Sequence, residues 1–191
     1  MSHPFLPQLI KGWLPPDLFF QQFGTPDSPR LHDALRCTSS LTRYLERQTQ
    51  QTVRVRLAGQ SPIVDAAGDA ILWTGQQNLP AADAILVRDA WLLLADQAWI
   101  FAHSQVTVDH LAAEARAAIE RGEEPLGSLF LEREGQVERT DLELALAEVP
   151  ALASHLGHAT GQRYWCRRSL FRVNQSIRAR IFEIFLPVLF A

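Results

Sequence analysis

Residues 84–106 read AILVRDAWLLLADQAWIFAHSQV, and this stretch decides the class of the fold. Two apolar runs separated by a polar pair are typical of a β-hairpin, and here the runs are 84–95 and 99–106, with Asp96 and Gln97 at the turn. Side chains two residues apart share one face of a strand, and both faces of the first run are mainly apolar. We therefore expect this strand to be central in a sheet, with Arg88 buried in it.

Further strand patterns flank this hairpin along the chain. The C-terminal part contains a second pair of strand-like runs, 163–173 and 177–187, around a turn at 174–176. Upstream, 52–59 alternates with period two, and a short apolar stretch at 71–73 suggests another strand. Strands joined in hairpins form antiparallel sheets, so the sequence predicts at least five antiparallel strands.

Helical spacing of apolar residues lies mostly between these strands. It predicts two short helices within 30–50, the second capped by Ser39 or Ser40, and a helix over 108–121 that ends at Gly122. A further helical stretch is expected over 141–156, and residues 1–29, rich in proline and aromatic residues, are expected to form an irregular arm. This mixture predicts an α+β fold, with residues 1–191 forming a single domain.

The composition is that of an ordinary globular protein, with 47% hydrophobic and 20% charged residues in 191. Its formal net charge of −3 argues against a nucleic-acid binder, because such proteins are usually strongly basic. The apolar run at 181–191 is too short to cross a bilayer, which takes about 20 residues, and the proline-rich start does not resemble a signal peptide. Two cysteines without a disulfide pattern complete the expectation of a cytoplasmic protein with no stable membrane insertion.

Several charged residues fall on apolar strand faces, where burial is costly unless the charge is paired: Arg88, Arg167, Arg168 and Glu183. In one interpretation Arg88 forms a buried ion pair with Glu183 or Asp89. In the other, an arginine on an apolar wall binds the carboxylate of a ligand, which a guanidinium holds through two parallel hydrogen bonds. The periodicity alone does not choose between these interpretations.

Other candidate groups carry weaker signals. His155 and His158 have too few companions to predict a metal site, and His103 is interpreted as a core or rim histidine with a hydrogen-bond partner. Cys37 and Cys166 lie in apolar settings without a His/Asp arrangement, which favours inert thiols over a nucleophile. No metal and no cofactor are therefore expected.

Four segments resemble the bacterial chorismate lyase family in order and spacing: YWCRRSLFRVNQSIRARIFEIFLP (164–187), LVRDAWLLLADQAWIFAHS (86–104), EPLGSLF (124–130) and SSLTRYLE (39–46). The most specific is the first, with its Trp-x-Arg-Arg-Ser start and its Glu-x-Phe-Leu-Pro end. The resemblance implies a six-stranded antiparallel sheet with helices packed on it and an internal site closed by flap-like helical segments.

The resemblance also implies a reaction, in which chorismate loses pyruvate to give 4-hydroxybenzoate for ubiquinone biosynthesis, with no metal or cofactor. In the family's pattern Arg88 binds the ring carboxylate and Glu183 contacts the ring hydroxyl and is the candidate base. Leu126 and Leu41 supply backbone or apolar contacts, and Arg167 or Arg168 is a candidate for the pyruvyl carboxylate. The expected partners are chorismate and 4-hydroxybenzoate, on a monomeric enzyme that binds no nucleic acid.

This chain departs from the family's pattern near the site, since Ala102-His103-Ser104 stands where Gly-Arg-Thr/Ser or Ala-Arg-Ser is usual, and Glu124 replaces a threonine. These departures leave substrate affinity and product release open. Two alternatives to the enzyme stay open as well. One is a metabolite-binding module of the same fold, as found in transcription regulators, and the other is an inactive homologue.

Overall fold

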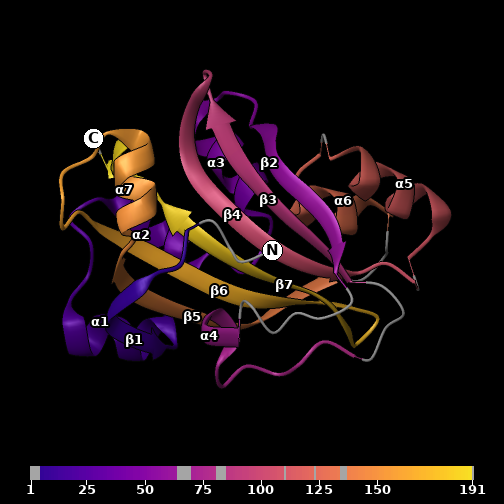
Figure 1. The fold of residues 1–191 in the computed structure, drawn as a ribbon, viewed down its shortest axis with the longest axis horizontal. Helices are drawn as coiled ribbons and strands as arrows, with labels where there is room; N and C mark the ends of the chain where they lie inside the picture. Colours follow the sequence, from indigo (N-terminus) through magenta and orange to yellow (C-terminus); the bar gives the residue numbers. More distant parts are fainter. Residues whose placement is uncertain are drawn as a thin grey trace.

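A computed structural model of the chain describes residues 5–63, 70–80, 85–109, 111–122, 124–133 and 137–190. It contains a strongly curved antiparallel sheet of seven strands, in the order β1-β5-β6-β7-β4-β3-β2 (Figure 1). The strands are β1 (Gln8–Leu14), β2 (Arg54–Ile63), β3 (Ile85–Leu94), β4 (Gln97–Thr107), β5 (Val137–Glu148), β6 (Arg163–Val173) and β7 (Ser176–Phe185). The α+β class and the antiparallel sheet are confirmed, and the strand number of six is corrected to seven.

Two groups of helices cover the two faces of the sheet. The helices are α1 (Pro16–Phe23), α2 (Pro29–Arg36), α3 (Leu41–Thr49), α4 (Ala70–Trp73), α5 (Ala113–Arg121), α6 (Leu126–Arg133), α7 (Pro150–Leu156) and a 3-10 helix, η2 (Pro187–Phe190). We call the sheet face that carries Arg88, Ala102 and Glu183 the pocket face. The helices α1, α2 and α3 pack on one half of this face, and α5 and α6 pack on the other half. The opposite face, with His103 and Phe182, is covered by α4 and α7 (Figure 1).

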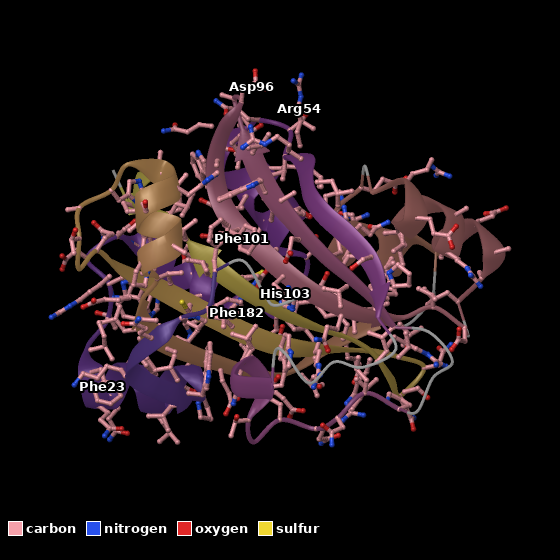
Figure 2. The ribbon with its side chains drawn as sticks, in the orientation of Figure 1. Phe23, Arg54, Asp96, Phe101, His103 and Phe182 are labelled. Atoms are coloured by element: carbon pink, nitrogen blue, oxygen red, sulfur yellow. The ribbon has the colours of Figure 1, made fainter. Side chains whose placement is uncertain are left out.

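The two predicted hairpins, β3–β4 and β6–β7, are confirmed, although the first turn lies at Ala95 and Asp96 and Gln97 already belongs to β4. Each pair is joined by a two-residue turn whose residues both have positive φ, Ala95 (46°) and Asp96 (62°) in the first and Asn174 (49°) and Gln175 (68°) in the second. Such turns match the right-handed twist of the strands that they connect. At the tip of the first hairpin an exposed ion pair joins Arg54 to Asp96 at 3.2 Å (Figure 2).

The helices predicted within 30–50 and near 108–121 are confirmed as α2, α3 and α5. Ser40 caps α3, since its Oγ accepts a hydrogen bond from the backbone N–H of Arg43 at 3.3 Å. Gly122 follows α5 with φ 74°, a left-handed conformation that favours glycine. The helix α5 begins later than predicted, at Ala113, and residue 110 of the predicted range lies outside the described residues.

Three sequence predictions are wrong in detail. Residues 141–148, expected as helix, belong to β5, and α7 begins only at Pro150, whose fixed φ suits the first helical turn. The residues 71–73, expected as strand, lie in the single-turn helix α4. The arm 1–29, expected to be irregular, contains β1 and α1, because the outer edge of β5 accepts β1 as an additional strand. No helix among the described residues is long and apolar enough to span a membrane.

Candidate active site

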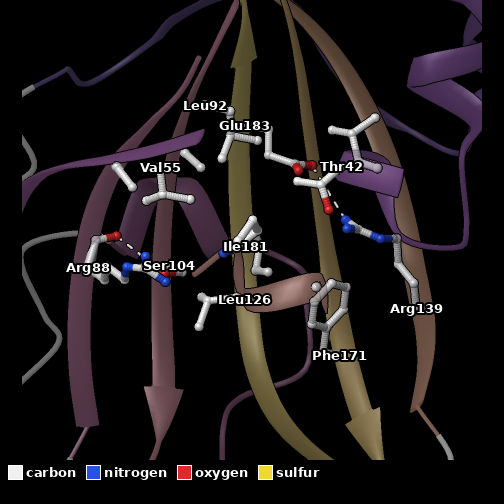
Figure 3. A pocket seen from close by; sticks show the side chains of 15 residues that line it. Thr42, Val55, Arg88, Leu92, Ser104, Leu126, Arg139, Phe171, Ile181 and Glu183 are labelled. Carbon is white, nitrogen blue, oxygen red and sulfur yellow. Dashed lines mark hydrogen bonds and ion pairs between the residues drawn. The ribbon is translucent and has the colours of Figure 1, made fainter. Parts of the chain in front are cut away.

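A pocket lies between the pocket face and the helices α3 and α6 (Figure 3). The empty space in it is about 490 Å³, which includes space open to solvent. Eight helices and strands contribute to it, and the described lining residues are Leu41, Thr42, Val55, Arg88, Ala90, Leu92, Ala102, Ser104, Pro125, Leu126, Gly127, Arg139, Phe171, Ile181 and Glu183. Its wall is mostly apolar, with a few charged groups that face inward.

Small side chains in register create the space. Ala90 pairs with Ala102 across β3 and β4, and Ala102 pairs with Glu183 across β4 and β7. In the next row Arg88 pairs with Ser104. Residues opposite each other on one face of a sheet are close neighbours, so two alanines and a serine in adjacent strands leave a hollow between Arg88 and Glu183.

Arg88 is buried without a carboxylate partner among the described residues. The residue is 2% exposed, and its Nη2 donates to the carbonyl oxygens of Gly122 at 2.7 Å and Glu124 at 2.8 Å. Its Nε is buried and has no hydrogen-bond partner within the described part of the chain. Burial lowers the pKa of Arg88 to about 10, so the guanidinium stays charged at neutral pH and is able to bind an anion.

The carboxylate of Glu183 is paired with arginines other than Arg88. Glu183 is 4% exposed, and its Oε2 accepts from Nε of Arg167 at 2.6 Å and lies 3.4 Å from Nη1 of Arg139. Arg167 also donates from Nη1 to the carbonyl oxygens of Ala34 and Cys37. Of the two interpretations of Arg88, the one in which it forms an ion pair with Glu183 or Asp89 is therefore wrong. Arg88 and Glu183 line one pocket without contacting each other.

Arg139 is the functional candidate that the sequence analysis missed. It extends from β5, 4.4 Å above the ring of Phe171, and its Nη1 donates to Ser169 Oγ at 2.7 Å (Figure 3). Its side chain is 4% exposed. Burial first, and then the charge of Arg167, lower the pKa of Arg139 to about 10, while Glu183 acts in the other direction. The omission follows from the misassigned helix, although Val137–Glu148 alternates in the way typical of strands.

The remaining predicted site residues divide between the two faces. Leu41 of α3 and Leu126 of α6 line the pocket, and Arg167 lies behind Glu183. Arg168 points to the opposite face, where its Nε donates to Glu143 at 2.8 Å and its Nη1 and Nη2 donate to backbone carbonyls near α4. Of the two candidates for the pyruvyl carboxylate, only Arg167 is thus on the pocket face.

The departures from the family pattern are also separated by the sheet. Ala102 and Ser104 line the pocket. His103 lies on the opposite face beside its cross-strand neighbour Phe182, is 1% exposed, and has its Nδ1 2.7 Å from Asp89 (Figure 2). The interpretation of His103 as a partnered core histidine is confirmed.

The thiols lie outside the pocket wall. Cys166 is fully buried on the opposite face, and burial raises the pKa of its thiol well above the usual range, which makes a thiolate unfavourable. Cys37 is partly exposed, with its Sγ near Ser39. In the described part of the chain, no three His, Cys, Asp or Glu residues are grouped as metal ligands.

Comparison with known proteins supplies the family. A family model described as chorismate lyase matches residues 12–191. The chain belongs to the chorismate lyase family. A probable chorismate pyruvate-lyase of Nitrosospira multiformis is 30% identical over 165 residues, which cover 84% of this chain and 88% of that relative.

Solved structures similar to this chorismate lyase family member support the fold. The effector domain of PhnF from Mycobacterium smegmatis matches with a TM-score of 0.52 at 13% identity, covering 77% of this chain and 88% of that domain. The gene product SA0254 of Staphylococcus aureus matches with a TM-score of 0.53 at 12% identity, and the match covers 78% of this chain and 89% of that protein. At this level of identity the likeness concerns the fold alone.

Proposed function

We propose that this protein is a chorismate lyase that removes pyruvate from chorismate and leaves 4-hydroxybenzoate, the ring precursor of ubiquinone. One observation carries the proposal: Arg88 and Glu183, on different hairpins, line a single mostly apolar pocket and do not contact each other. A ring with a carboxylate at one end and a hydroxyl group at the other is complementary to such a pocket. Membership of the family and the N. multiformis relative support the same reaction.

The reaction needs positioning more than it needs reactive groups. The ether C–O bond at C3 of the ring breaks and its electron pair leaves with enolpyruvate, which takes up a proton and becomes pyruvate. The C4–H bond also breaks, and its electron pair completes the aromatic ring while C4 keeps its hydroxyl group. Electrons balance without an oxidant or reductant. Holding a flexible dianion in one reactive conformation in a dry site contributes roughly 7–11 kcal/mol to lowering the barrier.

Each pocket group has a role in this proposal. Arg88 binds the ring carboxylate, and Leu41 and Leu126 pack against the ring. Glu183 contacts the 4-hydroxyl group and is the candidate acceptor of the C4 proton, held in place by Arg167. Because 4-hydroxybenzoate retains both the carboxylate and the hydroxyl group, the same contacts hold the product. We expect product release to be slower than the chemical step.

A metabolite-binding module is the second candidate function. The likeness to the effector domain of PhnF supports it at the level of the fold. Such a module would bind a small anion in the same pocket and leave it unchanged. An inactive homologue would also leave chorismate unchanged. One experiment with chorismate therefore separates the enzyme, the binding module and the inactive homologue.

The test is to incubate the purified full-length protein with chorismate and to measure pyruvate and 4-hydroxybenzoate together. We expect equal amounts of the two products, and the Arg88→Met variant serves as the matched negative control. Chorismate that binds without conversion would identify a binding module, and a protein that neither binds nor converts it would contradict the proposal. Sedimentation and cell fractionation check the predicted monomer and cytoplasmic location.

A further inference from the structure

We propose that Arg139 binds the second carboxylate of the substrate, on the enolpyruvyl side chain, and thereby selects dianions over the monoanionic product. This inference rests on the proposed lyase function and adds to it a specificity-determining residue. Among the pocket-lining residues that the structure describes, Arg88 and Arg139 are the two cations. They come from β3 and β5, on either side of Ile181 and Leu126 (Figure 3).

The balance of buried charge favours a dianion. On the pocket face, the described side chains that are almost fully buried include three guanidinium groups, Arg88, Arg139 and Arg167, and one carboxylate, Glu183. Three positive charges and one negative charge leave a surplus of two. Buried charges without compensation are costly, so a ligand with two negative charges suits this site better than a ligand with one.

The donors of Arg139 are less occupied than those of Arg167. Arg167 holds Glu183 at 2.6 Å and also donates to two backbone carbonyls. Arg139 has one short hydrogen bond, to Ser169, and its contact with Glu183 is 3.4 Å long. The Nε of Arg139 and the Nη2 of Arg167 are both buried without a hydrogen-bond partner among the described residues, but Nη2 of Arg167 already lies 2.6 Å from Oε2 of Glu183. Arg139 rather than Arg167 is therefore the arginine with donors available to a ligand.

Space for a side chain also lies next to Arg139. A smaller hollow adjoins the pocket and shares Gly127, Arg139 and Phe171 with it. Its other described lining residues are Thr38, Ser39, Ser40 and Val137, three of which carry hydroxyl groups. With the ring carboxylate on Arg88, an ether substituent on the far side of the ring reaches toward this polar hollow. The product lacks that substituent and makes no contact there.

A pair of inert ligands tests this without turnover. 3-(Carboxymethoxy)benzoate carries the ring carboxylate and a second carboxylate on an ether at C3, the position of the substrate's ether, whereas 3-methoxybenzoate carries only the first. Calorimetric titration of the wild type should show a preference of about tenfold or more for the dianion, as an added charge-assisted hydrogen bond provides. In Arg139→Met the dianion should bind about tenfold or more weakly, while the affinity for 3-methoxybenzoate changes by less than about threefold.

Two further variants make the result specific. Arg139→Lys keeps the positive charge and should retain part of the preference, which a purely structural role would not predict. Arg172→Met is the control, because Arg172 is a strand-paired neighbour of β5 that bonds to Thr140 and the 174–176 turn, outside the pocket lining. It should leave both affinities unchanged. Circular dichroism and the melting temperature check the fold of each variant.

The outcomes distinguish this inference from the proposed function. If Arg139→Met weakens both ligands equally, Arg139 acts only through Glu183 and the inference is overturned. If it weakens neither, the second carboxylate binds elsewhere, with the same consequence. If the wild type binds both ligands with the expected preference but does not convert chorismate, the lyase proposal fails while the role of Arg139 stands. For an active enzyme, Arg139→Met should raise KM for chorismate more than it lowers kcat.

Discussion

Buried arginines on the two faces of the same sheet have different surroundings. On the opposite face Arg168 is surrounded by partners: the carboxylate of Glu143, the carbonyls of Leu72 and Thr74, and the ring of Trp13 at 4.5 Å. On the pocket face Arg88 has two backbone carbonyls, no carboxylate among the described residues, and an apolar hollow beside it. One arginine completes a structural network, and the other is the residue that we propose binds the anionic ligand.

The neighbouring side chains explain this difference. Beside Arg88, the paired residues Ala90 and Ala102 are small and leave space. On the opposite face of the same two strands, Trp91 pairs with Phe101, and their ring centroids lie 4.9 Å apart, so that the interior is filled. A buried charge therefore indicates a binding site only where its row of neighbours is too small to fill the layer.

Exchanging one arginine on each face should give the sharpest contrast. Arg88→Met removes the anion contact and should lower kcat/KM for chorismate by about 10³-fold, in the range for loss of one charged transition-state contact. Arg168→Met leaves Glu143 without its partner and should cost about 3 kcal/mol of stability, as the breaking of a buried pair does, with little change in ligand affinity. Coupled pyruvate assays and urea unfolding measure the two effects.

The same pair of variants is able to break the comparison. Arg88→Met should keep a near-native melting temperature, because it removes a cation that burial disfavours. A variant that is inactive only because it is unfolded would show Arg88 to be structural, like Arg168. Susceptibility of the α5–α6 connection to proteolysis should increase in Arg88→Met, since Arg88 donates to the carbonyls of Gly122 and Glu124 there.

How much of the fold was predictable depends on local pattern. The hairpins β3–β4 and β6–β7 were predictable because apolar alternation and the turn lie together in the sequence. The strand β5 was not, because the run from Asp141 to Ala147 is rich in Leu, Ala and Glu, which are good helix formers. Its strand conformation depends on pairing with β6 and β1, partners distant in sequence. Long-range pairing overrides local propensity here.

The site was predictable to the same extent. Arg88 and Glu183 stand out because each interrupts an otherwise apolar strand face. Their partners depend on the register between strands, which periodicity does not reveal: Glu183 faces Arg167 across β6 and β7, and Asp89 faces His103 across β3 and β4. Arg139 was missed because the helix predicted from residue 141 onward left its strand unrecognised, although the alternation of Val137–Glu148 is typical of strands.

Filling the hollow with a larger side chain should have different effects from the same change on the opposite face. Ala102→Leu places a larger side chain in the pocket and should weaken 4-hydroxybenzoate binding by about a hundredfold, as expected when steric overlap costs a few kcal/mol. Its stability should change little, because the side chain occupies existing space. Ala145→Leu is the matched change in the packed layer of the opposite face, where overpacking should cost about 1–3 kcal/mol and leave ligand affinity unchanged. Equal destabilisation by both substitutions would show that the hollow is no real void.

Alkaline pH should produce the smallest effect, and it separates the faces by electrostatics. Burial lowers the pKa of Arg88 to about 10, so its folded-state pKa lies below that of the unfolded chain. Loss of the Arg88 proton therefore raises the free energy of unfolding instead of lowering it. The same loss removes the contact between Arg88 and the anionic ligand. The affinity for 3-methoxybenzoate, whose carboxyl group is its one titrating group, should be constant from pH 6 to 9 and fall about tenfold per unit above about pH 10.

Arg168 differs in this respect, because Glu143 counteracts the lowering of its pKa by burial. The ion pair of Arg168 with Glu143 on the opposite face should accordingly persist at pH values at which ligand binding is already declining. Calorimetric titration together with circular dichroism at each pH measures both, and Arg139→Met, which lacks the other pocket cation, should show the same decline. An affinity that already falls between pH 7 and 9, or a loss of structure that accompanies it, would assign the titration to a group other than Arg88.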